Sequence, residues 1–435
     1  MNQIVEPKIL KGFRDSLPET ETVKKQIIRK LEETFTRFGF DPVDTPALEY
    51  ASVLLGKGSG ETDKQIYRFR DNGGRDVALR FDLTVPFARL IAAHRSELPM
   101  PFRRYHIAKV WRGENTQKGR YREFTQCDFD IVGSDSPLND LDILLLMNES
   151  FRVLGIDGVT FHISHRGIFN DFLKKEGIET ASADILRTVD KIGKIGEEEV
   201  RRLLTELLTA EKAEKIIDFI RPEETNERTL QKLTRFCGGE TQNTARLSDL
   251  LRMLEAAEVG AKFKINPSIT RGLDYYTGIV YETFLNALPG IGSVCSGGRY
   301  DNLTSIYTKE RIPGVGSSIG LDRLMAALGE LGLLPGTKTG TAALVCLQDE
   351  RFLDGCLRLT QRLREAGIAC ELYPEAKKLP KQFSYAETKG VAFAVIYGEA
   401  EAASGTVTVK DLTKRENRAE ISFEEALAWI KREGR

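Results

Sequence analysis

The stretch most informative about the fold runs from Arg104 to Val132 and reads RYHIAKVWRGENTQKGRYREFTQCDFDIV. In its first part, residues 104–112, aromatic and aliphatic residues occupy alternate positions, which predicts a β-strand. Residues 113–119 are polar and contain two glycines, and they predict a turn. Residues 121–132 predict a second long strand, so the stretch should form a hairpin with an unusually basic tip.

The second predicted strand carries a graded set of side chains on one face. Because side chains alternate along a strand, this face presents a base, an aromatic ring, an amide and two acids: Arg122, Phe124, Gln126, Asp128 and Asp130. At roughly 3.3 Å per residue, Phe124 and Asp130 lie about 20 Å apart, the length of a nucleotide joined to a small amine. Phe124 could stack on a base, and Asp130 could pair with an ammonium or a ring nitrogen. A solvated, charged hairpin explains the pattern equally well.

Three further arginines are candidates for binding a nucleotide. Arg112 and Arg120 flank the predicted turn, and their forked donors suit phosphates. Residues 313–320 read PGVGSSIG, and such glycines would let the backbone approach a flat ligand on which Arg323 could stack. The spacing differs from that of a dinucleotide-binding fingerprint, and a tight strand-to-helix turn also explains these glycines.

The segment 271–278 reads RGLDYYTG and has an unusual composition. Arg271 could stabilise charge that develops on a transferring phosphoryl group. Tyr275 and Tyr276 could form an amphipathic pocket. Neighbouring tyrosines are also common at the edge of a sheet, so the composition alone leaves both interpretations open.

The rest of the chain predicts several folded parts in a reducing compartment. Its 435 residues suggest about three domains, and helical periodicity fills residues 168–261. Strands alternate with helices after residue 340, which predicts a small α/β domain with a mostly parallel sheet. The formal net charge is −1, so any contact with RNA must be local. Six dispersed cysteines and the lack of a long apolar segment favour the cytoplasm and exclude a disulfide framework.

Other familiar chemistries find little support. Residues 56–60 read GKGSG and lack the P-loop pattern, so they predict either a mobile surface loop or a substrate lid. His162 and His165 are three apart on a predicted strand and should face opposite ways, so a metal pair is not expected. Cys295 has no indicated base and is interpreted as an inert buried thiol.

Taken together, these segments resemble the class II aminoacyl-tRNA synthetases. Residues 112–114 with 120–124 are similar to motif 2 of that class, residues 314–323 to motif 3, and residues 40–46 to motif 1, which builds the dimer interface. The segment 271–278 and the segment 295–301, CSGGRYD, resemble two signatures of the histidyl-tRNA synthetase family. The resemblance extends from Lys11 through the C-terminal domain.

The resemblance implies an α+β fold. It comprises a class II catalytic domain with an antiparallel sheet flanked by helices, a helical insertion and a C-terminal α/β anticodon-binding domain. The implied boundaries are 1–168 and 262–331 for the catalytic domain, 169–261 for the insertion, 332–340 for a linker and 341–435 for the anticodon-binding domain.

The resemblance also implies an activity. A member of the family ligates L-histidine to tRNA(His) with ATP, through histidyl-adenylate, and releases AMP and diphosphate. Mg²⁺ would accompany the β- and γ-phosphates, and no metal-binding residue is predicted. The expected form is a cytoplasmic homodimer without membrane contact.

Roles for individual residues follow from the same resemblance. The implied ATP-binding residues are Arg112 at the α-phosphate, Glu114 at the adenine or a metal-linked group, Arg120, and Phe124 with Arg323 on the two faces of the adenine. Arg112 and Arg271 are the implied catalytic residues, with Arg271 replacing a metal that related enzymes use. The implied histidine-binding residues are Asp82, Thr84, Gln126 and Asp130, with Tyr275, Tyr276 and Tyr300 closing the pocket.

Two segments depart from the pattern of many bacterial members. Asp82-Leu83-Thr84 stands where they have Glu-Gly-Thr, and it keeps a carboxylate and a hydroxyl. Asn115-Thr116-Gln117 stands where they have Arg-Pro-Gln, in a loop that faces the tRNA acceptor end in the family. The second departure affects how the extra 5′ guanosine of the tRNA is read.

Three alternatives compete with this interpretation. The regulatory subunit of ATP phosphoribosyltransferase senses histidine without ligating it, but it usually lacks the Arg271-type signature and the C-terminal domain. A class II synthetase for another amino acid is disfavoured by Asp130 and the paired tyrosines. A stand-alone tRNA-binding module would not need the graded strand face.

Overall fold

A computed structural model describes residues 5–55, 60–270, 275–334, 336 and 338–433, without the side chains of 60–62. The chain forms two compact units, residues 1–14 with 27–333 and residues 15–26 with 334–435. Helix α1 (Pro18–Arg37) contributes to both units. Arg271 and most of the predicted loop at 56–60 lie outside the described residues.

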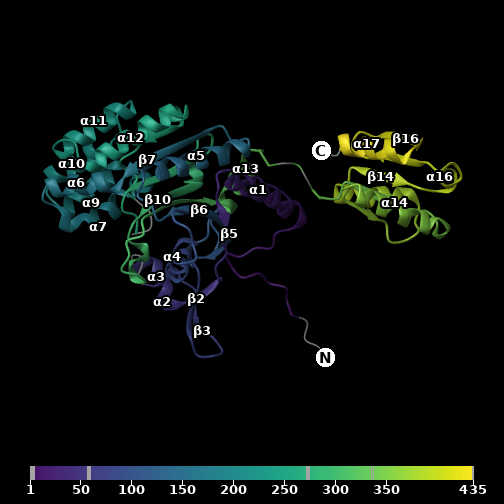
Figure 1. Ribbon diagram of the computed structural model, residues 1–435, viewed down its shortest axis with the longest axis horizontal. Helices are drawn as coiled ribbons and strands as arrows, with labels where there is room; N and C mark the ends of the chain where they lie inside the picture. The colour runs from purple at the N-terminus through teal and green to yellow at the C-terminus, as the bar shows by residue number, and fades with distance from the viewer. Residues whose placement is uncertain (1–4, 56–59, 271–274, 335, 337, 434–435) are drawn as a thin grey trace. The chain divides into compact units, whose positions relative to one another are not determined.

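Among the described residues, the first unit is built on an eight-stranded mixed sheet (Figure 1). Across the sheet its strands follow the order β1 (Asp41–Pro42), β5 (Phe102–Trp111), β6 (Glu123–Val132), β11 (Gly314–Gly320), β10 (Cys295–Tyr300), β9 (Ile279–Leu285), β7 (Val159–His165) and β8 (Phe263–Ile265). The strands from β5 to β7 pair antiparallel, whereas each edge strand runs parallel to its neighbour. The expected antiparallel sheet is therefore confirmed in its centre, and its edges make it mixed.

The predicted hairpin is present as β5 and β6, with Arg104 opposite Asp130. The second strand begins at Glu123, two residues later than predicted. The reason is that residues 117–120 close their own turn, and the N–H of Arg122 donates to the carbonyl oxygen of Gly12 at 2.9 Å. The N-terminal segment therefore takes the donor that would have extended the strand.

The glycine-rich stretch at 313–320 is a strand and not a strand-to-helix turn. Residues 314–320 form β11 between β6 and β10, and α13 (Leu321–Glu330) follows directly. A Cβ atom added to Gly316 would lie 2.0 Å from Oδ1 of Asp130. Glycine at this position therefore makes room for a side chain of the neighbouring strand.

Helices flank the sheet of the first unit. Helix α5 (Pro137–Val153) follows Ser136, whose hydroxyl caps it by accepting from the N–H of Leu138. A small antiparallel sheet and short helices complete this part: β2 (Leu48–Tyr50), α2 (Ala51–Leu54), α3 (Gly60–Gln65), β3 (Arg68–Arg70), β4 (Asp76–Leu79) and α4 (Thr84–Ala93).

The helical insertion expected from periodicity lies between β7 and β8 and gathers at one end of the sheet in Figure 1. It consists of α6 (Arg166–Lys175), α7 (Ser182–Val189), α8 (Ile192–Ile195), α9 (Glu197–Leu207), α10 (Ala210–Ile220), α11 (Asn226–Cys237) and α12 (Gln242–Ala256). Its core includes Phe172 stacked on Phe219, with 4.4 Å between the ring centroids. The apolar faces of these amphipathic helices thus pack together in one interior.

The second unit contains a five-stranded sheet and its covering helices. The strand order is β13 (Cys370–Leu372), β12 (Ala343–Cys346), β14 (Phe393–Ile396), β15 (Val407–Asp411) and β16 (Glu416–Ile421), and the helices are α14 (Leu353–Glu365), α15 (Leu379–Lys389), α16 (Glu399–Ser404) and α17 (Phe423–Glu433). The prediction of a mostly parallel sheet is wrong for β15 and β16, which pair antiparallel. The short turn between them permits only an antiparallel pair.

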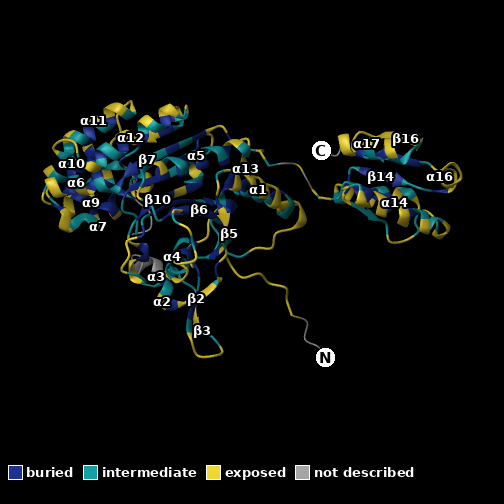
Figure 2. Ribbon diagram, in the orientation of Figure 1, coloured by how far each residue is buried: buried dark blue, intermediate teal, exposed yellow. Residues whose placement is uncertain are grey.

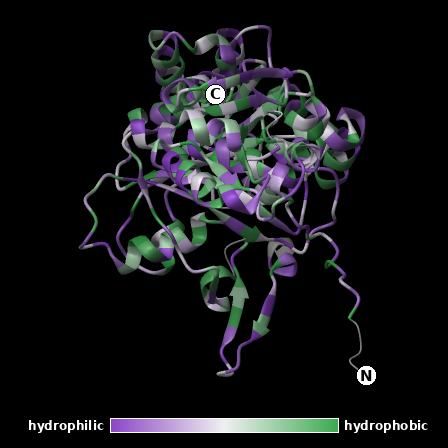
Figure 3. Ribbon diagram, turned by 90° about the vertical axis from the view of Figure 1, so that its right-hand side faces the viewer, coloured by the Kyte–Doolittle hydropathy of each residue, from purple (hydrophilic) through white to green (hydrophobic). Residues whose placement is uncertain are grey.

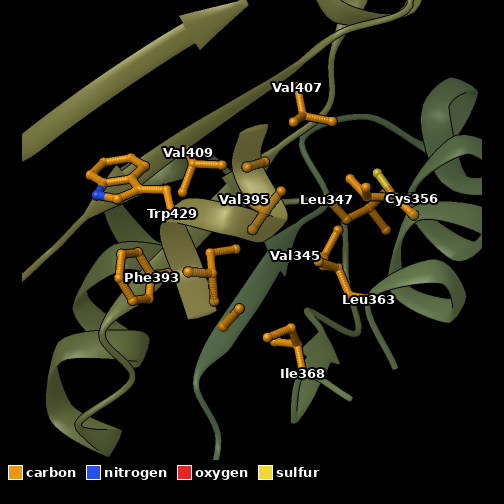
Figure 4. Packing of buried hydrophobic residues seen from close by; sticks show 14 residues of the cluster. Val345, Leu347, Cys356, Leu363, Ile368, Phe393, Val395, Val407, Val409 and Trp429 are labelled. Carbon is orange, nitrogen blue, oxygen red and sulfur yellow. The ribbon is translucent and has the colours of Figure 1, made fainter. Parts of the chain in front are cut away.

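The buried residues lie mainly in the strands of each sheet and on the helix faces that cover them. In Figure 2 the strands of the first unit are largely dark blue, and β6 is buried over most of its length. In the second unit Phe393 and Trp429 meet with 5.7 Å between ring centroids, inside the apolar cluster drawn in Figure 4. None of the described helices is long and apolar enough to cross a membrane, and hydrophilic and hydrophobic positions are mixed along the ribbons of Figure 3.

Candidate active site

The sheet of the first unit carries a cavity of about 1050 Å³. Its wall combines residues of β6, β9, β10 and β11 with the segment before α4 and with α7 and α8 of the insertion. Eight residues of the predicted site line this cavity: Asp82, Thr84, Arg112, Gln126, Asp130, Tyr275, Tyr276 and Tyr300. The structure therefore brings together residues that lie more than 200 positions apart in the chain.

Four other predicted residues do not line the cavity: Glu114, Arg120, Phe124 and Arg323. The guanidinium carbon of Arg112 lies 5.2 Å from the ring centroid of Phe124. Arg120 pairs with Glu114 at 3.4 Å on the hairpin turn. The N–H of Thr125, the residue after Phe124, donates to Oδ2 of Asp322 at 2.6 Å, and Arg323 follows Asp322. This bond joins β6 to the start of α13, and Arg323 itself donates to the carbonyl oxygen of Ser293 at 2.7 Å. The adenine-binding role of Phe124 and Arg323 stays a prediction.

Asp82 is fixed by the start of α4. Its Oδ1 accepts from the N–H of Val85 at 3.0 Å, and Oδ2 lies 3.4 Å from the hydroxyl of Tyr275. Helix α4 begins at Thr84, and Asp82 satisfies a donor of its first turn. Burial raises the pKa of Asp82, while the Val85 N–H and the charge of Arg112 lower it.

Asp130 belongs to a fully buried ion pair. Its Oδ2 lies 2.7 Å from Nη2 of Arg104, and the two side chains are 3% and 0% exposed. The hydroxyl of Tyr300 donates to Oδ1 of Asp130 at 2.6 Å. Burial raises the pKa of Asp130, and Arg104 opposes this rise. Arg104 was missed by sequence reasoning, although a correct hairpin register would have placed it opposite Asp130.

Asp128 is a second missed residue. It lines the cavity, is 1% exposed, and lies between Gln126 and Asp130 on the strand face identified from parity. Burial, with repulsion from Asp130 and Asp82, raises the pKa of Asp128 to about 7, although Arg104 and Ser318 act in the opposite direction. Its membership of the graded face was the signal that could have found it.

Two acceptor atoms in the cavity wall have neither a hydrogen bond nor an ion pair among the described residues. They are Oε1 of Gln126 and Oδ1 of Asp128. The amide of Gln126 is oriented by Nε2, which donates to the hydroxyl of Ser318 at 2.7 Å. Because buried acceptors are normally satisfied, this arrangement suits a ligand rich in N–H donors and of positive charge.

The insertion supplies cations that sequence reasoning did not identify. Arg187 lies on α7, Lys191 lies directly before α8, and Lys194 lies on α8. All three line the cavity. Nothing in the local pattern of a charged helical segment distinguishes these residues from a solvated face. Only the packing of the insertion over the sheet places them at the site.

A family model described as histidyl-tRNA synthetase matches residues 12–324. The chain belongs to the histidyl-tRNA synthetase family. A second model, described as an anticodon binding domain, matches residues 341–433. The resemblance and the fold class inferred from the sequence are therefore confirmed.

Relatives in this family match nearly the whole chain. A protein of Treponema denticola named histidine–tRNA ligase is 50% identical over 397 residues, which are 90% of this chain and 89% of the relative. One of Wolinella succinogenes with the same name is 46% identical over 97% of this chain and 98% of the relative. The crystal structure of histidyl-tRNA synthetase from Nostoc sp. PCC 7120 has a TM-score of 0.88 and 32% identity, and covers 99% of this chain and 100% of the other.

Proposed function

We propose that this chain ligates L-histidine to tRNA(His), using ATP, through a histidyl-adenylate intermediate and with release of AMP and diphosphate. Membership of the histidyl-tRNA synthetase family and near full-length relatives named histidine–tRNA ligase support this function. The observation that carries it is the cavity, where the buried acceptors Gln126 and Asp128 lie on one strand with Asp130, and Arg112 lies in the same wall. The acceptors would bind a cationic amino acid, and Arg112 would bind a phosphate.

Adenylation needs the histidine carboxylate to attack the α-phosphorus of ATP while the bond to diphosphate breaks. We infer that Arg112 binds the α-phosphate from the end of β5, and that Arg271 stabilises the charge developing there. Arg271 lies outside the described residues, and its role rests on the family signature. Phe124 and Arg323 would bind the two faces of the adenine, next to the pair formed by Arg120 and Glu114. Positioning and charge stabilisation would supply most of the catalysis.

The amino acid would lie deeper in the cavity. Asp82, Thr84 and Gln126 would bind its ammonium group, and Asp130 would bind the imidazole. Tyr275 lies 5.0 Å from Tyr276 and 5.9 Å from Tyr300 between ring centroids, so the three rings form one aromatic wall. Such a wall would exclude water and select a flat side chain.

Mg²⁺ would accompany the β- and γ-phosphates of ATP. This ion uses few protein carboxylates and keeps phosphate and water ligands, so it needs no cage of side chains. Glu114 fits this requirement, since its carboxylate is partly exposed and only loosely paired with Arg120. When bound, the ion would neutralise charge on the departing diphosphate.

The tRNA would meet local positive charge from the insertion. Because the net charge of the chain is −1, a basic patch must supply the attraction for phosphates. Arg187, Lys191 and Lys194 offer such a patch at the cavity. A cytoplasmic location and the domain boundaries predicted above are part of the same proposal.

The function is tested by ATP–pyrophosphate exchange with each of the amino acids in turn, followed by charging of tRNA(His). Exchange is expected with histidine only, because the acidic, aromatic pocket suits an imidazole. Exchange with a different amino acid would contradict the specificity. If no amino acid supports exchange, a histidine-sensing regulatory subunit becomes the better interpretation.

The homodimer is tested separately. The edge strand β1 lies in the motif 1-like segment 40–46, where both of its residues are exposed, so a partner could cover it. Sedimentation is expected to give twice the mass of the 48.8 kDa chain. A monomer at micromolar concentration would contradict the proposal.

A further inference from the structure

Asp128 is a buried carboxylate in the cavity to which the roles above assign nothing. It is 1% exposed, and its Oδ1 has no hydrogen-bond partner among the described residues. It precedes Asp130 by two residues on β6, so both side chains leave the same face of the strand. A buried carboxylate with an unused acceptor requires a donor, and in this cavity the donor can come from the substrate.

Asp128 forms no ion pair of its own among the described residues, although the charges of Arg104 and Arg80 act on it. Arg104 lies opposite Asp130 on β5 and pairs with it at 2.7 Å. His106 lies directly opposite on β5, but it contacts Asp44 at 2.9 Å and burial lowers its pKa to about 3, so the ring is neutral.

Arg80 also acts on Asp128 through its charge, but it donates to the carbonyl oxygens of Thr45 and Lys109. The other neighbours are neutral or acidic. Ser318 lies opposite Asp128 on β11 and is neutral, and Asp82 on the segment before α4 is itself an acid. Tyr276 contributes a phenol whose pKa is raised by burial and by the nearby carboxylates, so it stays protonated. A positively charged ligand would therefore be stabilised beside Asp128.

The spacing of the two acids matches the donors of a protonated imidazole. Residues two apart on a strand are separated by roughly 6.6 Å. The two N–H bonds of an imidazolium diverge, and acceptors bonded to both at about 2.8 Å lie roughly 7 Å apart. Asp128 and Asp130 could thus each accept from one ring nitrogen.

We propose, on the basis of the function proposed above, that Asp128 is a specificity-determining residue that binds the second ring nitrogen of histidine, so that the side chain is held as an imidazolium between Asp128 and Asp130. A neutral imidazole has one donor and one acceptor nitrogen, and it would present a lone pair to one of the two carboxylates. The pocket therefore selects the ring by its ability to carry a proton as well as by its shape.

Because the bound state holds one more proton than the free components, KM for histidine should depend on pH. Without ligand, the pKa of Asp128 is raised to about 7, and free imidazole titrates near 6.5. Above pH 7 the carboxyl is ionised and the free ring is neutral, so binding must take up one proton. KM for histidine should then rise about tenfold per pH unit between pH 7.5 and 8.5.

The first test is Asp128→Asn in the full-length chain, with Asp142→Asn as the matched control. Asp142 also pairs with an arginine of β5, Arg103 at 2.6 Å, but it does not line the cavity. At pH 7.5 the Asp128 variant should raise KM for histidine roughly 10–100-fold, the size expected for a charged hydrogen bond, with a much smaller change in kcat. Its KM should also stay flat above pH 7.5, whereas the control keeps the wild-type slope.

The second test uses the wild-type protein and does not depend on the variant folding. Calorimetry in buffers of different ionisation enthalpy should show uptake of about one proton per histidine bound at pH 8. A 1,2,4-triazolylalanine, whose ring stays neutral at this pH, should be activated roughly 10–100-fold less efficiently than histidine.

The outcomes separate this inference from the function itself. If histidine supports exchange but binds without proton uptake, or if Asp128→Asn keeps the wild-type KM and pH slope, the role of Asp128 is wrong and the function stands. If histidine supports no exchange at all, the proposed function fails and this inference fails with it.

Discussion

Replacing Arg112 by alanine is expected to lower histidine-dependent ATP–pyrophosphate exchange by about 10²–10³-fold, the usual cost of removing one positioned donor from a developing anion. Nε of Arg112 donates to the carbonyl oxygen of Phe81 at 2.9 Å, and the guanidinium lies 5.2 Å from the Phe124 ring centroid. These contacts hold the group at the cavity wall before ATP arrives. Histidine binding, measured by calorimetry, should remain detectable because Arg112 contacts the nucleotide.

A matched control for this variant lies on the same strand. Arg103→Ala removes an arginine of β5 that pairs with Asp142, and it should leave exchange within about twofold of wild type. Arg112→Lys should stay close to the alanine variant, since a single ammonium cannot reproduce two forked donors. Near-normal exchange by Arg112→Ala would remove this residue from the catalytic set.

Replacing Asp130 by leucine is expected to abolish exchange and to lower the free energy of unfolding by about 3–5 kcal/mol. The reason is that Arg104, which is 0% exposed, would keep its charge in the interior without its counter-ion. The ring of Phe87, 4.3 Å from the guanidinium carbon, would offset only a small part of this cost. Urea denaturation of the full-length chain measures the change.

The double variant Arg104→Met with Asp130→Leu separates stability from function. Removing both charges should restore most of the free energy of unfolding, because an apolar pair of similar size avoids the desolvation cost. Exchange should stay undetectable, since the acid proposed to bind the imidazole is gone. If Asp130→Leu alone unfolds like wild type, the buried pair does not stabilise this sheet.

Much of the fold was predictable because local periodicity carries it. The hairpin of β5 and β6, the helical insertion and the α/β character of the second unit all follow from patterns within short windows. The strand at residues 314–320 was not predicted, because a strand of glycine and serine lacks the apolar alternation that marks strands. The glycine at position 316 makes room for the side chain of Asp130, which is distant in sequence.

The candidate site was likewise predictable only in part. Strand parity alone placed Gln126, Asp128 and Asp130 on one face, and all three line the cavity. It could not indicate that Arg104 neutralises Asp130, because that pairing depends on the register of the hairpin. Nor could it bring Lys191 of the insertion to the same cavity.

The sequence by itself therefore determined the family, the elements and one chemically graded strand face, since each depends on residues close together in the chain. Only the tertiary structure decided which acid is paired and which is left for a ligand. That distinction depends on burial and on contacts between segments far apart in sequence. Asp128 and Asp130 are alike in the sequence, and packing alone gives Asp130 its arginine and leaves an acceptor of Asp128 without a partner among the described residues.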